Sequence, residues 1–174
     1  NVRKEIAWHD MSIGATADYS TNTSKILRQS VITDYQYNSF FVSANLAFNL
    51  IKNIRLTENC RCTISQSKSG NYTNIIRNFS NEAALSIAFI PDRLILNTNL
   101  QYTHNSGFTD KKDYTFMNLS ITFKTKKKIQ FVLNVDNVFN TKTFIYRSNS
   151  NLSESYTLYQ LRPRSVMLTS HLAL

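Results

Sequence analysis

The fold is decided by the stretch Phe40-Phe41-Val42-Ser43-Ala44-Asn45-Leu46-Ala47-Phe48-Asn49-Leu50. Its even-numbered residues are all apolar, whereas its odd-numbered residues after Phe41 are serine, asparagine and alanine. Because successive side chains of a strand point to opposite faces, this alternation predicts a strand with one apolar and one polar face. Eleven residues are long for a globular strand and match a tilted strand that crosses a bilayer. The stretch therefore predicts a transmembrane β-strand.

Similar alternation recurs along the chain. We expect about eight strands, near residues 8–20, 38–50, 54–65, 80–90, 94–104, 114–124, 129–138 and 158–174. We expect tight turns at 51–53, 91–93 and 125–128 and long polar loops at 21–37, 66–79, 105–113 and 139–157. Short turns that alternate with long loops are typical of outer-membrane barrels. The predicted fold is an all-β antiparallel transmembrane β-barrel meander that occupies residues 1–174.

Overall composition hides this pattern. The chain of 174 residues is 42% hydrophobic, and its mean hydropathy is −0.29. Its longest apolar run, residues 87–90, is far shorter than the roughly 18 residues of a membrane helix. A polar lumen face would lower the hydropathy of a barrel in this way. No signal peptide follows Asn1-Val2-Arg3-Lys4, so we expect either a mature chain or the end of a longer one.

The predicted faces differ in chemistry. On the apolar face, aromatic residues are expected near the short turns (Phe48, Phe89, Phe123, Phe131) and near the long loops (Tyr19, Phe40, Tyr102), as in two interfacial girdles. Strand parity predicts that lipid contacts Leu96, Leu119, Ile121 and Leu133, and that the lumen contacts Asn97, Asn118, Ser120 and Asn134. The same parity points Glu58 toward lipid, unless a bulge turns it inward.

Neither the net charge nor the cysteines indicate a functional site. The net charge of +9 would suit a nucleic-acid partner, but the basic residues gather in turns and loops instead of on one periodic face. We therefore expect no nucleic acid. Cys60 and Cys62 share a strand face at a spacing awkward for a disulfide, and we interpret both as small apolar fillers.

No catalytic motif is visible. His9, His104 and His171 lie on different segments, and neither Asp18 nor Asp136 forms a recognisable grouping with them. The sequence predicts no enzyme, no catalytic or metal-ligating residues and no cofactor. The identity of a ligand stays open: sugar, peptide, siderophore and haem would all suit polar loops that carry Tyr72, Phe108, Tyr146 and Tyr156.

The last forty residues resemble a known family. The run Leu133-Asn134-Val135-Asp136-Asn137-Val138-Phe139-Asn140-Thr141-Lys142 is similar to the Asn-(Leu/Val/Ile)-Phe-Asn-x-Lys element before the last loop of TonB-dependent receptors. A loop rich in serine and tyrosine follows, and residues 159–166 then resemble the Tyr-x-Leu-Arg-Pro-Arg-x-(Val/Ile) closing strand of such receptors from the Bacteroidetes lineage. Upstream, the likeness is one of hairpin rhythm.

The resemblance implies the C-terminal part of an outer-membrane receptor that imports a nutrient in a Gram-negative bacterium. The family's barrel has about 22 strands around a plug domain, so this chain would supply roughly the last eight. The implied partners are outer-membrane lipid and lipopolysaccharide, the plug and remaining strands, and indirectly TonB. The alternative is a free-standing eight-stranded barrel with a structural or adhesive role. The receptor hypothesis predicts that segments 8–20 and 158–174 do not pair with each other.

Overall fold

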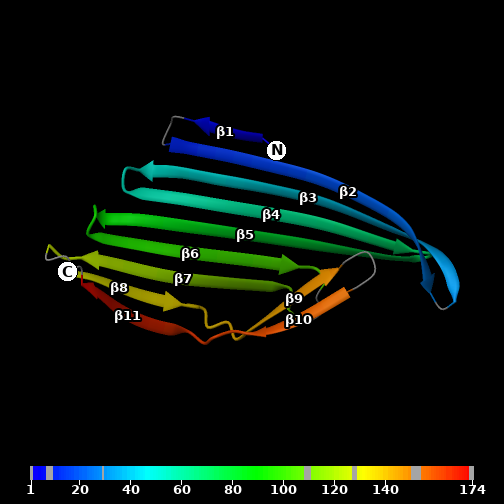
Figure 1. Ribbon diagram of the computed structural model, residues 1–174. Helices are drawn as coiled ribbons and strands as arrows, with labels where there is room; N and C mark the ends of the chain where they lie inside the picture. Colours follow the sequence, from blue (N-terminus) through cyan, green and yellow to red (C-terminus); the bar gives the residue numbers. More distant parts are fainter. Residues whose placement is uncertain are drawn as a thin grey trace.

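The computed structural model describes residues 2–6, 10–28, 30–107, 111–126, 129–149 and 154–172. These residues form an all-β antiparallel meander, which confirms the predicted fold class at that level. Nine strands form the main sheet in the order β1-β2-β3-β4-β5-β6-β7-β8-β11 (Figure 1). They are β1 (Val2–Ile6), β2 (Met11–Arg28), β3 (Val31–Ile51), β4 (Ile54–Ser69), β5 (Tyr72–Ile90), β6 (Leu94–Asn105), β7 (Asp113–Lys124), β8 (Ile129–Asp136) and β11 (Ser165–Leu172).

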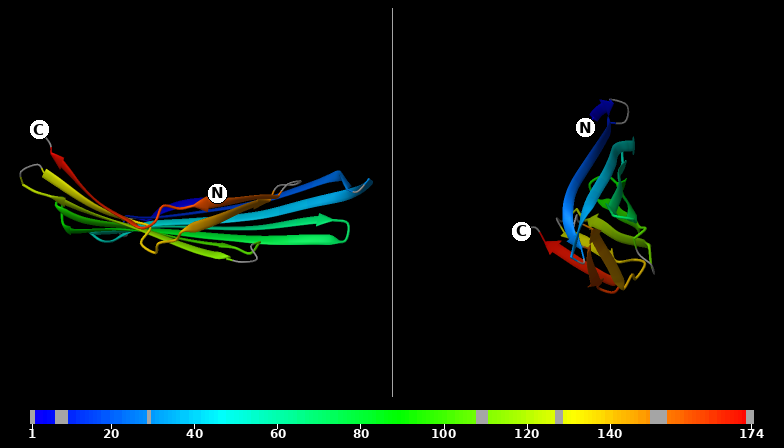
Figure 2. Two further views of the ribbon diagram at one scale, coloured as in Figure 1. Left: turned by 90° about the horizontal axis from the view of Figure 1, so that it is seen from below. Right: turned by 90° about the vertical axis from the view of Figure 1, so that its right-hand side faces the viewer.

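A second, two-stranded sheet is made by β9 (Thr143–Asn149) and β10 (Glu154–Gln160). This hairpin lies between β8 and β11 in the chain and outside the main sheet (Figure 2). The main sheet is a single curved layer with β1 at one edge and β11 at the other. In the described part of the chain, no ladder joins β11 to β1 or β2, as the receptor hypothesis predicts.

Two of the predicted long loops are wrong, because strands replace them. Strands β2 and β3 continue through most of 21–37, and β4 and β5 continue through 66–79. The hairpins close at tight turns in which Ser30 and Gly70 have positive φ of 64° and 57°. Glycine adopts such a conformation without steric cost. The polar residues of these segments had favoured loops, but ladder hydrogen bonds need no apolar side chains.

The chain ends also differ from the prediction. The sequence pattern missed β1, which has only five residues, of which three are charged. The single strand predicted over 158–174 is two strands, β10 and β11, separated by residues 161–164. Pro163 lies in that gap, and proline cannot donate a ladder hydrogen bond. Likewise 139–157 is not a plain loop, because it holds β9 and the start of β10.

Register confirms the predicted partition of side chains between the two faces. Leu96 pairs with Ile121 and Ile121 with Leu133, whereas Asn97 pairs with Ser120 and Ser120 with Asn134. The pairing around Glu58 is continuous, with Leu46 on one side and Ala83 on the other. No bulge turns Glu58 inward, so it shares the apolar face.

The sheet has no core of its own over most of its area. The only buried hydrophobic residues among those described are Tyr35, Ile76 and Tyr114, and their strand parity places all three on the otherwise polar face. The apolar face stays accessible, with Tyr19 64% and Leu168 69% exposed. Among the described residues, no helix is long and apolar enough to cross a membrane.

Candidate functional site

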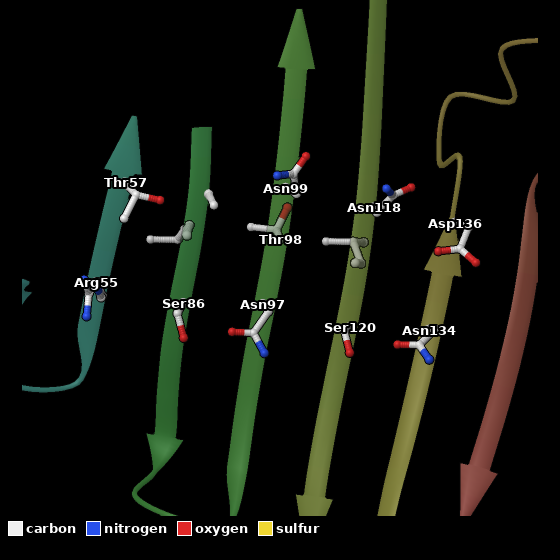
Figure 3. A pocket seen from close by; sticks show the side chains of 13 residues that line it. Arg55, Thr57, Ser86, Asn97, Thr98, Asn99, Asn118, Ser120, Asn134 and Asp136 are labelled. Carbon is white, nitrogen blue, oxygen red and sulfur yellow. The ribbon is translucent and has the colours of Figure 1, made fainter. Parts of the chain in front are cut away.

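A shallow polar groove crosses the middle of the sheet on its polar face. Alternate residues of β4 to β8 provide its floor. Cross-strand pairing aligns the side chains that lie on the same face of neighbouring strands into rows. Figure 3 shows these side chains on neighbouring strands. The groove has a volume of about 330 Å³. Its polar side chains come from Arg55, Thr57, Ser86, Asn97, Asn99, Asn118, Ser120, Asn134 and Asp136, whereas the side chain of Thr98, which also lines it, lies on the apolar face.

Hydrogen bonds within and beside the groove fix some of these side chains. Asn99 donates from Nδ2 to Glu82 Oε1 at 2.8 Å. On the neighbouring strand, Asn118, the cross-strand partner of Asn99, accepts through Oδ1 from the backbone N–H of Asn137 at 2.9 Å. The groove therefore presents amides, hydroxyls and a few charges on a rigid ladder, and this surface suits water or another polar protein surface.

A second pocket lies on the same face, toward the ends of the long hairpins. Here Phe144 of β9 packs edge-on against Tyr114 and Phe116 of β7, with ring centroids 5.1 and 5.7 Å apart. Tyr159 of β10 stacks on the same Phe144 ring at 6.2 Å. Because Tyr159 is the cross-strand partner of Phe144 within the hairpin, it is the contacts of Phe144 with Tyr114 and Phe116 that hold the β9–β10 hairpin against the sheet. They also explain why Tyr114 is only 3% exposed.

This aromatic pocket has a volume of about 340 Å³. Its walls combine rings, amides, hydroxyls and cations, contributed by Phe41, Arg61, Thr63, Asn78, Ser80, Thr103, Asn105, Lys112, Tyr114, Phe144 and Ile145. Phe79 and His104 also line it, but their side chains lie on the apolar face. Two of its polar atoms, Asn78 Oδ1 and Thr103 Oγ1, are buried and have no hydrogen-bond partner in the described structure. Buried polar atoms without partners are rare, and each calls for an explanation.

Two asparagines of the motif at residues 133–142, Asn137 and Asn140, form a hydrogen-bonded cluster at the base of the β9–β10 hairpin, the Asn137 cluster. Asn137, with φ of 52°, accepts from the backbone N–H of Thr141 at 2.9 Å and donates from Nδ2 to the carbonyl oxygens of Thr141 and Arg162. Asn140, with φ of 55°, accepts from the backbone N–H of Arg164 at 3.0 Å. The two asparagines thus join the chain before the hairpin to the Leu-Arg-Pro-Arg segment after it.

The apolar face carries one polar cluster near its middle. Asn81 of β5 donates from Nδ2 to Glu58 Oε1 at 2.8 Å and lies 2.9 Å from the Sγ atom of Cys60. Glu58 therefore has an amide as its hydrogen-bond donor, and no ion pair joins it to a cation among the described residues. Cys60 and Cys62 are both free thiols, but Cys60 contacts polar atoms and is more than an apolar filler.

On the same face, at the start of β7, the Asp113 carboxylate interacts with the side chains of Tyr102 and His104. Its Oδ1 accepts from the Tyr102 hydroxyl at 2.5 Å and lies 2.8 Å from His104 Nδ1. The hydrogen bond from Tyr102, and then that from His104, lowers the pKa of the Asp113 carboxyl below its ordinary value. Asp113 therefore stays ionised at neutral pH. Sequence reasoning missed this group, because β6 and β7 bring His104 and Asp113 together only through their register.

The candidates from the sequence have separate places in the fold. His104 and His171 lie on different strands, Asp18 and Asp136 do not meet, and the described residues contain no cluster of three potential metal ligands. Tyr72 and Tyr156 are 61% and 63% exposed. His9 and Phe108, and the side chain of Tyr146, lie outside the described residues. The aromatic pocket instead uses Phe41, Tyr114 and Phe144, which sequence spacing did not single out.

Replacing Phe144 tests whether its ring holds the hairpin on the sheet. We expect Phe144→Ala to weaken hairpin docking by roughly 1–3 kcal/mol, because two ring contacts with the sheet and their buried area are lost. Trypsin cleavage at Arg147 should then become severalfold faster. Phe139→Ala, near the base of the hairpin but 52% exposed, is the matched control and should leave the rate unchanged. Equal cleavage of both variants would contradict the packing role.

Comparison with family models, with curated proteins and with solved structures finds no match to this chain.

Proposed function

We propose that this chain is a wall segment of an outer-membrane β-barrel, the C-terminal part of a TonB-dependent receptor that imports a nutrient. One observation carries the proposal: a single-layer sheet leaves a mostly apolar face uncovered over most of its area, with the Glu58 cluster near its middle and other charges, such as Asp113, toward the strand ends and the β1 edge. In water such a face favours aggregation or association. In a bilayer it needs no cover, because lipid chains solvate it.

The distribution of aromatic side chains supports a bilayer. On the apolar face, Tyr19 lies midway along β2, Tyr102 lies near the end of β6, and Phe123 and Phe131 pair with each other beside the short turn. Aliphatic residues such as Leu96 and Leu119 lie between these two levels. In membrane barrels aromatic residues are enriched at both interfaces, so the membrane-crossing part would end near Tyr19 and Tyr102.

The open sheet favours a receptor segment over the alternative of a small closed barrel. Strand β11 pairs with β8 on one side only, and β2 is covered by β1 only from Met11 to Ala15. An eight-stranded barrel would join its first and last strands. The groove also favours a wide lumen, because its asparagine and serine side chains are small, whereas interiors of eight-stranded barrels are filled by side chains.

Cysteine labelling in native membranes tests the orientation. In a background with Cys60→Ala and Cys62→Ala, single cysteines replace Leu96 or Leu119 on one face and Asn97 or Ser120 on the other. A water-soluble maleimide should label the second pair and spare the first, because lipid covers the apolar face. If all four positions react alike, the apolar face is not covered by lipid. Reaction at the two leucine positions alone would invert the assignment of the faces.

A further inference from the structure

We propose that the aromatic pocket beneath the β9–β10 hairpin binds a small ring-containing anion that also carries a hydrogen-bond donor. The inference deepens the proposed receptor function, and it rests on that function only for the side from which the ligand arrives. The chemistry of the pocket itself follows from its walls. Its volume of about 340 Å³ lies in the range of small-molecule sites.

The requirement for a ring comes from three aromatic walls on three strands. Phe41 of β3, Tyr114 of β7 and Phe144 of β9 line the pocket together. Phe144 and Tyr114 already form an edge-to-face pair and Tyr114 is only 3% exposed, so a ligand ring would pack against Phe144 and Phe41 and extend an arrangement that aromatic groups prefer.

The requirement for negative charge comes from the ionisable groups. Arg61 and Lys112 line the pocket, whereas no aspartate or glutamate is among its lining residues. The only ion pairs among the described residues are Arg3–Glu5 and His104–Asp113, so Arg61 and Lys112 are not neutralised by a side chain there. Glu82, further along the polar face, accepts from Asn99. A guanidinium group binds carboxylate or phosphate groups through charge-assisted hydrogen bonds.

The requirement for a donor comes from the two unsatisfied oxygens. Asn78 Oδ1 can only accept, and it is buried in the pocket wall without a partner. Thr103 Oγ1 is buried and unpartnered beside it, on the strand that pairs with β5. Because Asn78 Oδ1 is buried, a ligand hydroxyl or amine would satisfy it only after the Asn78 side chain rotates toward the pocket, and relief of the desolvation cost of that oxygen would then favour binding.

Titration calorimetry with 4-hydroxybenzoate, on the protein extracted from membranes in detergent, tests the pocket. The probe supplies a ring, a carboxylate and a hydroxyl. We expect saturable binding that is at least about tenfold tighter than that of neutral 4-hydroxybenzyl alcohol. Arg61→Gln should abolish that preference. Arg55→Gln is the matched control, because Arg55 lies on the same strand and face but lines the other groove, and it should keep the preference.

A second pair of probes isolates Asn78. Wild-type protein should bind 4-hydroxybenzoate more tightly than benzoate, and Asn78→Ala should remove this difference while it leaves benzoate binding intact. Absence of saturable binding, or an unchanged charge preference in Arg61→Gln, would overturn the inference. The maleimide labelling experiment separates the two proposals. If 4-hydroxybenzoate binds but the apolar face is labelled, the pocket proposal holds and the receptor proposal fails. If the apolar face is protected but 4-hydroxybenzoate does not bind, the receptor proposal holds and the pocket proposal fails.

Discussion

Leu119→Arg should destabilise the folded protein in lipid by about 2–4 kcal/mol, because the substitution places a charge in the middle of the apolar face that we propose faces lipid. Leu119 pairs with Thr98 and Val135 on the apolar face. The cost is that of moving a guanidinium group away from water into hydrocarbon. Equilibrium unfolding in denaturant, with the protein in phospholipid vesicles, measures it.

The neighbouring residue provides the control. Ser120→Arg changes the next position of the same strand, but its side chain lines the polar groove. It should cost less than about 1 kcal/mol, because the guanidinium group stays in water. Equal costs for the two variants would argue for a soluble sheet or for a different register.

Asn137→Ala should cost about 2–4 kcal/mol through a different mechanism. The substitution removes three side-chain hydrogen bonds, each worth about 0.5–1.5 kcal/mol, and forces alanine to adopt a φ of 52°. Because those bonds join Thr141 to Arg162, we also expect the base of the β9–β10 hairpin to open. Hydrogen exchange of the Thr141 amide, together with denaturant unfolding, measures both effects.

Two further variants separate the causes. Asn137→Gly should recover about 1 kcal/mol of the loss, since glycine accepts positive φ, but it should not restore protection of the Thr141 amide. Asn97→Ala removes a groove asparagine at a regular strand position and should change stability by less than about 0.5 kcal/mol. If Asn137→Ala lowers the free energy of unfolding no more than Asn97→Ala does, the Asn137 cluster is not a determinant of stability.

The sequence predicts the central sheet well and its ends poorly, for physical reasons. Where one face is apolar, strand period and register follow from the alternation, as at Leu96 and Asn97. Where both faces are polar, as at Thr21 to Lys25, alternation disappears although the ladder continues. Tyr35 is informative in hindsight, since it is buried within a segment that the pattern assigned to a loop.

The pocket was beyond sequence reasoning because it depends on a fold-back. Phe144 lies 30 residues from Tyr114 along the chain, and the two rings meet only because the chain turns back at the Asn137 cluster. The motif around Asn137 was recognisable, but its pattern carries no information about which face the following hairpin covers. In the same way, register rather than spacing joins Glu58 to Asn81.

The meander order has a consequence for how the molecule holds together. Each strand from β2 to β7 pairs only with its predecessor and its successor in the chain. The folding of each strand therefore depends directly only on its two neighbours. Repeat proteins with such linear connectivity unfold from their ends inward, because interior units have two neighbours and terminal units have one. Exchange rates of backbone amides should then rise toward the short terminal strand β1 and fall toward β4 and β5, which gives the sheet a gradient of stability rather than a single value.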